Sequence, residues 1–209
     1  MTLLLLVRHA LTEATGKRLT GQAPGFHLSD EGRAQAERLA ERLEPVPLAA
    51  VYASPLERCL ETARAVASPK GLAVRPARGL IEVGYGAWTG RPLSQLSRTR
   101  LWGTVQRTPS AVRFPDGETL VEVQHRSVTE LDRVSAAHPK QIVAAVTHAD
   151  VIRLALAHYA GIHLDLYQRL VVGPASVTAV VVGDGAPRIV RVNDVGSLAD
   201  LVPSRRVRG

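Results

Sequence analysis

Charged and nucleophilic side chains directly follow the apolar segments of this chain at three places. They are Arg8-His9 after residues 3–7, Ser54 to Arg58 after residues 49–53, and His148 after residues 141–147. Burying an arginine and a histidine at the end of an apolar strand is costly unless both have partners. A bound phosphate would satisfy both, so the first junction already suggests phosphate chemistry.

The second junction has the composition of a helix start. Ser54 suits the N-cap, Pro55 the first helical position and Glu57 the far side of a capping box. Long helical side chains lean toward the N-terminus of their helix, so the Arg58 guanidinium is expected to reach the space above the sheet. There it could grip an anion bidentately. An exposed helix arginine is the alternative interpretation.

The third junction places His148 where another helix should begin. The backbone N–H groups of Ala149 and Asp150 would then be free, which favours an anion. In the first turn of that helix, the Asp150 carboxylate would stabilise the helix dipole. A histidine that only caps or packs the helix is the alternative.

The elements that must position these groups alternate between strand and helix patterns. This alternation is typical of an α/β fold, here a three-layer α/β/α sandwich with a mostly parallel sheet of about six strands and one antiparallel edge. The strands are expected near residues 3–7, 49–53, 72–74, 141–147, 177–182 and 188–192, the last two as the antiparallel pair. Open α/β sheets bind ligands at the carboxyl ends of their strands, where the three junctions lie.

The length of 209 residues suits one domain spanning 1–209. Glycine, proline and arginine interrupt residues 79–117, which we interpret as an active-site cover with a short helix near residues 93–105. A long helix is expected over residues 118–137, and residues 203–209 are expected to form a flexible tail.

The amino-acid composition argues against a membrane partner and against a nucleic-acid partner. With 45% hydrophobic and 22% charged residues, the chain is typical of a soluble globular protein, and we expect it to be cytoplasmic and without a membrane partner. The net charge of +7 comes mainly from arginines spread along the chain. A nucleic-acid-binding protein would show a basic stripe with aromatic residues between, so no nucleic-acid partner is expected. The excess of arginine suits phosphorylated substrates.

The three junctions together resemble the histidine phosphatase superfamily, which includes cofactor-dependent phosphoglycerate mutases and many small phosphatases. The resembling segments, in chain order, are Arg8-His9-Ala10, Ser54-Pro55-Leu56-Glu57-Arg58, Glu82 within residues 80–86, and His148-Ala149. Residues 112–118 and 164–169 are also similar to actinobacterial proteins described as phosphomutases. Each motif alone is weak, but their common order along the chain is specific.

The resemblance implies roles for particular residues. His9 would be the nucleophile that becomes phosphorylated, and Arg8, Arg58 and His148 would form the phosphate pocket. Glu82 would protonate the leaving group and later activate water. The resemblance implies neither a metal nor another cofactor.

Some positions depart from the family's pattern. Alanines stand at 10 and 149 where glycines are usual, and a left-handed backbone there would be strained. Ala149 still belongs to the expected substrate pocket. Thr15 replaces an asparagine that often contacts phosphate, and its hydroxyl could substitute. Asp150 is a rival for Glu82 as the acid.

Three functions remain open from the sequence. The first is a metal-independent phosphomonoesterase that acts on a small-molecule phosphomonoester. The second is a phosphoglycerate mutase-like phosphomutase with the same phosphohistidine, for which the cover arginines at 91, 98, 100, 107 and 113 could bind a carboxylate. The third is a non-catalytic phospho-ligand binding protein, against which the expected proton donor Glu82 argues. A homodimer could form through the antiparallel edge near residues 177–192.

Overall fold

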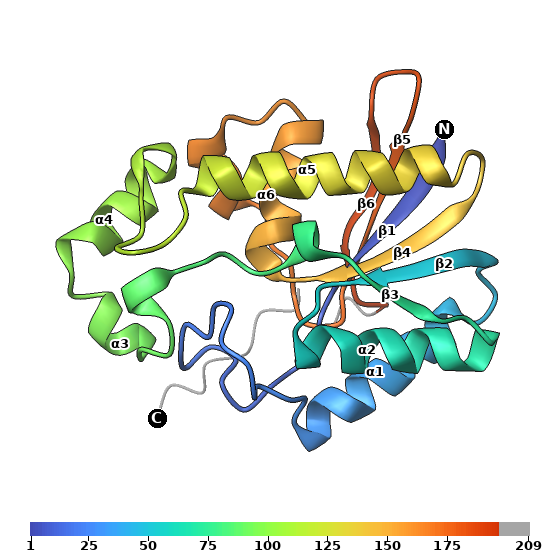
Figure 1. Ribbon diagram of the computed structural model, residues 1–209, viewed down its shortest axis with the longest axis horizontal. Helices are drawn as coiled ribbons and strands as arrows, with labels where there is room; N and C mark the ends of the chain where they lie inside the picture. The colour runs from blue at the N-terminus through green and yellow to red at the C-terminus, as the bar shows by residue number, and fades with distance from the viewer. Residues whose placement is uncertain (197–209) are drawn as a thin grey trace, which may run out of the picture.

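The computed structural model describes residues 1–196 and contains one mixed sheet of six strands, ordered β3-β2-β4-β1-β5-β6 (Figure 1). The strands are β1 (Thr2–Arg8), β2 (Leu48–Ala53), β3 (Val74–Pro76), β4 (Ile142–Thr147), β5 (Val177–Val182) and β6 (Arg188–Asp194). Strand β3 begins at Val74, where the expected strand ended. The residues expected as a tail, 203–209, lie outside the described residues.

The strand directions confirm the expected topology. β1 pairs in parallel with β4, β4 with β2, and β2 with β3. β5 runs antiparallel to β1, and β6 runs antiparallel to β5 at the edge of the sheet. The parallel strands therefore present their carboxyl ends at one edge of the sheet.

Helices cover both faces of the sheet, which gives the three expected layers. Figure 1 shows α1 (Asp30–Leu43) and α2 (Glu57–Ala67) on one face, and α5 (Leu120–Ala137) and α6 (Ala149–Tyr159) on the other. Short 3₁₀ helices occur at Ser68–Lys70, Arg78–Leu80, Gly86–Trp88, Pro109–Ala111 and Leu164–Arg169. Among the described residues, no helix is long and apolar enough to cross a membrane.

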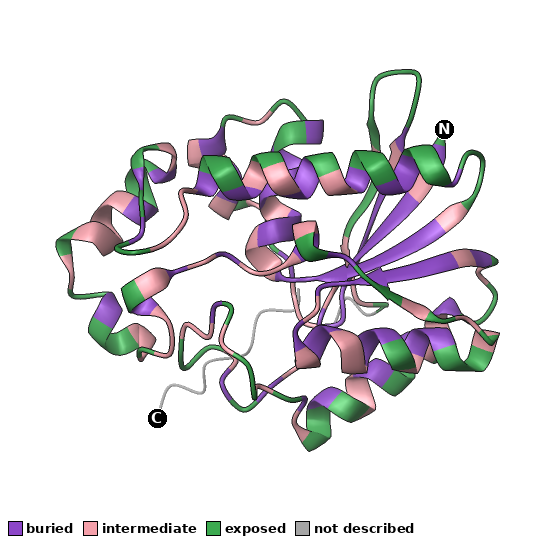
Figure 2. Ribbon diagram, viewed as in Figure 1, coloured by how far each residue is buried: buried purple, intermediate pink, exposed green. Residues whose placement is uncertain are grey.

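The uninterrupted apolar run of β1 is explained by burial on both faces. Leu5 and Val7 pack into the cluster under α1 and α2, whereas Leu4 and Leu6 pack into the cluster under α5 and α6. Successive strand side chains point to opposite faces, so a strand covered on both sides must be apolar throughout. Figure 2 shows the central strands almost entirely buried.

The expected cover over residues 79–117 contains two short helices instead of one, α3 (Leu93–Leu96) and α4 (Arg100–Arg107). A third apolar cluster holds the cover against α5 and α6. Trp88 is buried and stacks on Trp102 with ring centroids 6.3 Å apart. The two tryptophans therefore pack the cover.

The capping box expected at Ser54 is wrong. Helix α2 begins at Glu57, and its N-cap, Leu56, makes no side-chain capping bond. The structure has a capping box at α5 instead, where the Thr119 hydroxyl accepts from the Glu122 N–H and the Glu122 carboxylate accepts from the Thr119 N–H. Ser54 lies three residues before α2, where its hydroxyl accepts from the Leu56 N–H at 3.5 Å and also bonds His148.

We expect Thr119→Ala to destabilise the protein by about 1 kcal/mol, because the substitution removes half of the α5 capping box. For a chain of this length, the melting temperature should fall by about 2–4 °C. Calorimetric melting measures the change. Thr129→Ala, an exposed position in the same helix, is the matched control, and an equal loss there would contradict the capping role.

Candidate active site

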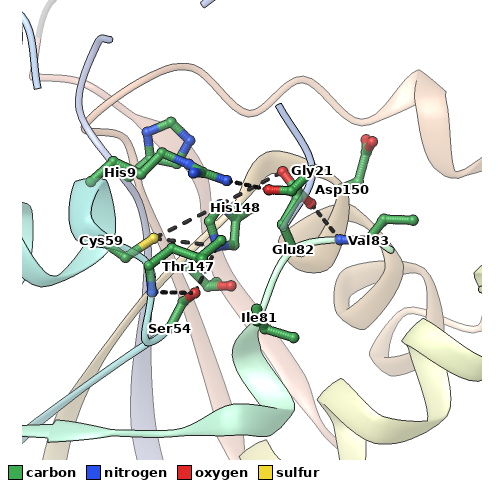
Figure 3. A network of polar contacts seen from close by, with 12 residues as sticks. His9, Gly21, Ser54, Cys59, Ile81, Glu82, Val83, Thr147, His148 and Asp150 are labelled. Atoms are coloured by element: carbon green, nitrogen blue, oxygen red, sulfur yellow. Dashed lines mark hydrogen bonds and ion pairs between the residues drawn. The ribbon is translucent and has the colours of Figure 1, made fainter. Parts of the chain in front are cut away.

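The pairing of β1 with β4 brings two histidines together. Arg8 is the register partner of Thr147, so His9 and His148 each follow that pair by one residue. Their rings lie edge to face with centroids 5.3 Å apart. Figure 3 shows the two rings side by side, with Ser54 and Cys59 on one side of His148 and Glu82 on the other.

Hydrogen bonding fixes the tautomer of His9. Its Nδ1 lies 2.8 Å from the Ala10 carbonyl oxygen. Because a carbonyl can only accept, Nδ1 carries the proton and Nε2 keeps its lone pair. Burial, and then repulsion by Arg58 and Arg8, lower the pKa of His9 to about 3. His9 is therefore a neutral imidazole, the form that can act as a nucleophile.

Two arginines beside His9 have unused donors. Arg58 is only 1% exposed, and its Nη2 donates to the Gly21 carbonyl at 2.8 Å. Its Nε and Nη1 are buried and have no partner among the described residues. Arg8 donates through Nη1 to the Val172 carbonyl at 2.7 Å, while its buried Nε also lacks a partner. Buried charged donors without acceptors are costly, so this arrangement favours a bound oxyanion.

Ser54 and Glu82 contact opposite nitrogens of the His148 ring. Ser54 Oγ lies 2.8 Å from His148 Nε2 and 3.5 Å from the Leu56 N–H, which it accepts. When the hydroxyl donates its proton to Nε2, the ring proton of His148 is on Nδ1. Nδ1 is 3.6 Å from Glu82 Oε2 and so faces the acid. Burial, followed by repulsion from Arg58, lowers the pKa of His148 well below its ordinary value.

Glu82 has the properties of a proton donor near neutral pH. Burial, and then repulsion from Asp150, raise the pKa of Glu82 to about 7. Its Oε1 accepts from the Val83 N–H at 3.0 Å, which orients the carboxyl group. A carboxylic acid that holds its proton near pH 7 can protonate a leaving oxygen.

Arg126 on α5 positions the loop that carries Glu82. Its Nη1 donates to the carbonyls of Gly79 and Ile81, and its Nη2 donates to the carbonyl of Glu82 at 3.0 Å. Glu118 in turn pairs with Arg126 and accepts from the Gly84 N–H at 2.7 Å. The backbone on both sides of Glu82 is thus tied to α5 and to Glu118, two residues before α5.

These groups surround a cavity of about 260 Å³. Small-molecule sites commonly enclose about 300–1,000 Å³, so this cavity suits a small metabolite. The polar lining consists of Arg8, His9, Thr12, Thr15, Arg18, Thr20, Glu82, Tyr85, Asp150 and Arg153. Arg58 and His148 are more deeply buried and lie against His9.

The remaining expected positions are also near the cavity. Thr15 and Ala149 line it, but the Thr15 hydroxyl bonds the N–H and hydroxyl of Thr12. Neither Ala10 nor Ala149 has a positive φ, so the alanines at these positions cause no left-handed strain. Both oxygens of Asp150 are engaged, one by the Tyr85 hydroxyl at 2.7 Å and one by Arg153 at 3.1 Å.

The sequence missed two arginines of the cavity, Arg18 and Arg153. Arg153 lies four residues after Ala149 on α6, a spacing that places both on one helix face and could have indicated it. The mutase hypothesis proposed that arginines of the cover bind a carboxylate. All of these arginines are exposed, and none lines the cavity; they are the arginines at 91, 98, 100, 107 and 113. Within residues 1–196, no cluster of three or more His, Cys, Asp or Glu could hold a metal ion.

Comparison with known proteins identifies relatives over most of the chain. The model of the histidine phosphatase superfamily (branch 1) matches residues 4–195. Phosphoserine phosphatase 1 of Hydrogenobacter thermophilus is 31% identical over 80% of each chain. Phosphoglycerate mutase-like protein 4 of Arabidopsis thaliana is 33% identical over 72% of this chain and 67% of its own length. The mycobacterial glucosyl-3-phosphoglycerate phosphatase in complex with VO3 superposes with a TM-score of 0.83 at 27% identity, covering 91% of this chain and 98% of that one.

We expect Ser54→Ala to weaken the binding of inorganic phosphate by about threefold to tenfold, since losing this hydrogen bond frees His148 to adopt the other tautomer. Titration calorimetry measures the affinity, and ¹⁵N chemical shifts of the imidazole report the tautomer directly.

Ser176→Ala is the matched control, because the Ser176 hydroxyl is equally buried but has no hydrogen-bond partner among the described residues. Unchanged imidazole shifts in Ser54→Ala would contradict the positioning of His148 by Ser54.

Proposed function

The chain belongs to the histidine phosphatase superfamily, and from this premise we propose that it is a metal-independent phosphomonoesterase for small phosphorylated metabolites, with His9 as the phosphorylated nucleophile. One observation carries the proposal. The neutral His9 ring, with its Nδ1 proton on the Ala10 carbonyl, lies beside Arg58, whose buried Nε and Nη1 lack acceptors.

The first half of the reaction transfers the phosphoryl group to His9. The lone pair of Nε2 attacks phosphorus as the bond from phosphorus to the ester oxygen breaks. Arg8, Arg58 and His148 Nδ1–H stabilise the charge on the phosphoryl oxygens. Glu82 gives its proton to the departing oxygen, so an alcohol leaves and Glu82 becomes a carboxylate.

The second half regenerates the enzyme. The Glu82 carboxylate removes a proton from water, whose oxygen attacks the phosphorus of phosphohistidine. The bond between phosphorus and Nε2 breaks, and His9 returns to its neutral form with phosphate bound. Glu82 is again protonated, which closes the cycle without a net proton on the enzyme.

The positive charge that such a transfer requires comes from the protein itself. The guanidinium groups of Arg8 and Arg58 have buried donors without acceptors among the described residues, and arginine keeps its charge when it is buried. Because these fixed charges take the position that a metal ion holds in many phosphoryl-transfer enzymes, we propose that turnover needs no divalent cation.

A phosphomutase with the same phosphohistidine is the second candidate, favoured by the likeness to a phosphoglycerate mutase-like protein. Its cavity would have to hold the product while phosphate returns and exclude water. A non-catalytic binding protein is less favoured, since the raised pKa of Glu82 gives the site a proton donor that binding alone does not need.

We expect the protein to release phosphate from p-nitrophenyl phosphate equally well with and without a metal chelator. His9→Ala should lower this rate by about three orders of magnitude or more, because no other group replaces the nucleophile. The measurement is p-nitrophenol absorbance, together with ³²P labelling of the acid-labile phosphoenzyme.

The exposed His125→Ala on α5 is the control and should keep full activity. Substantial turnover or labelling in His9→Ala would rule out His9 as the nucleophile. Conversion of 3- to 2-phosphoglycerate, stimulated by the bisphosphate and faster than phosphate release, would favour the mutase.

Glu82→Gln should slow hydrolysis of alkyl phosphates by about 10²–10⁴-fold but that of p-nitrophenyl phosphate much less, because nitrophenolate leaves without a proton.

Since the protonated acid is the active form and its pKa is raised to about 7, wild-type kcat/KM for alkyl phosphates should fall as the pH rises above about 7. An ordinary glutamate, with a pKa near ~4.3, would place that fall in the acid range.

The exposed Glu37→Gln serves as the control for Glu82→Gln. If good and poor leaving groups suffered equal losses in Glu82→Gln, the acid role would be wrong.

A further inference from the structure

Arg153 lines the cavity but is not needed in the mechanism above. It lies one turn into α6, and its Nη1 donates to Asp150 Oδ1 at 3.1 Å. Its Nε is buried and has no hydrogen-bond partner among the described residues. A buried guanidinium N–H without an acceptor is costly, so a third arginine at this site has an unused donor.

The surroundings of Arg153 fix its orientation. Asp150, which holds Nη1, accepts on its other oxygen from the Tyr85 hydroxyl at 2.7 Å. Tyr85 itself is 4% exposed and packs edge to face on Phe114. With Nη1 occupied, the edge formed by Nε and Nη2 is the one that remains for a ligand. That edge matches the two oxygens of a planar carboxylate.

The net positive charge around the cavity is also larger than the negative charge of one phosphate monoester. Arg8, Arg18, Arg58 and Arg153 supply four positive charges around the cavity. With Glu82 protonated, as the acid role requires, Asp150 is the one negative charge among the described residues that line the cavity. A doubly charged phosphate monoester then leaves one positive charge uncompensated. Coulombic repulsion between Arg8 and Arg153 makes that excess unfavourable until a further anion enters.

We propose that the Nε and Nη2 edge of Arg153 binds a carboxylate of the substrate, so that the enzyme acts on small phosphomonoesters that also carry a carboxylate. The inference rests on the proposed phosphatase function and deepens it. With about 260 Å³ to hold both anionic groups, the cavity limits the carbon skeleton between them to a few atoms. Leu19 and Leu93 provide apolar lining for that skeleton.

The test compares 3-phosphoglycerate with glycerol 3-phosphate, which has the same three-carbon skeleton but a hydroxymethyl group in place of the carboxylate. A third substrate, 1,3-propanediol bisphosphate, has a second phosphate instead. Phosphate release should give a kcat/KM at least tenfold higher for 3-phosphoglycerate than for either of the others. In Arg153→Gln this preference should drop to less than threefold, mainly through a rise in KM for 3-phosphoglycerate.

Two further variants control the result. Arg153→Lys keeps the positive charge but loses the bidentate edge, so it should retain only part of the preference for 3-phosphoglycerate. It also replaces Arg153→Gln as the test variant if that protein does not fold. Arg38→Gln removes one exposed charge on α1 that does not line the cavity, and it should leave all three kcat/KM values unchanged. A preference lost equally in Arg38→Gln would mean that net charge, and not Arg153, selects the substrate.

Several outcomes would overturn the inference. Equal kcat/KM for 3-phosphoglycerate and glycerol 3-phosphate in the wild-type protein would exclude a carboxylate subsite. Equal losses for both substrates in Arg153→Gln would mean that Arg153 serves the transferred phosphate. A higher kcat/KM for the bisphosphate would assign the edge to a second phosphate. Each of these differs from failure of the proposed function, in which no ester, including p-nitrophenyl phosphate, would release phosphate.

Discussion

Arg58 carries a permanent positive charge inside the protein, and two of its guanidinium nitrogens, Nε and Nη1, have no acceptor among the described residues. Such burial is unfavourable unless an anion completes the site. Burial, and then this charge, lower the pKa of His9 to about 3 and keep its imidazole neutral. Burial instead raises the pKa of Glu82 to about 7, so a large fraction of this carboxyl group holds its proton near neutral pH. One buried cationic pocket therefore favours phosphate binding, and its desolvation sets both protonation states that the proposed chemistry needs.

Two separate parts of the structure hold the residues of this pocket in place, the sheet and the cover. The parallel register of β1 and β4 fixes the two histidines relative to each other, because each follows the Arg8 and Thr147 pair directly. The loop that carries Glu82 has no strand to hold it, and Arg126 instead binds three of its carbonyl groups. A rigid arrangement of nucleophile and acid thus depends on two separate hydrogen-bond systems, one in the sheet and one on α5.

Local sequence patterns were sufficient for the main elements. β1 and β4 were predictable because strands buried on both faces must be apolar throughout, and the long helix α5 because its apolar residues recur at helical spacing. The start of α2 was not predictable in this way. Ser54 has the composition of a helix cap, but its hydroxyl bonds His148, which is 94 residues away in the sequence. No local pattern relates Ser54 to this partner.

The sequence by itself determined which chemistry-bearing side chains stand at the ends of β1 and β4, since the ends of apolar runs are visible in the order of residues. The helix start after β2 indicated Arg58, and the resemblance to a known family added Glu82 as a further site residue. Only the tertiary structure decided that Arg153 and Arg18 face the cavity, while the five cover arginines expected to bind a carboxylate lie exposed outside it. The physical reason is that the type of a residue determines only which groups its side chain can bind. Which side chains share a cavity, and which of their donors lack a partner, depends on contacts between segments far apart in the chain.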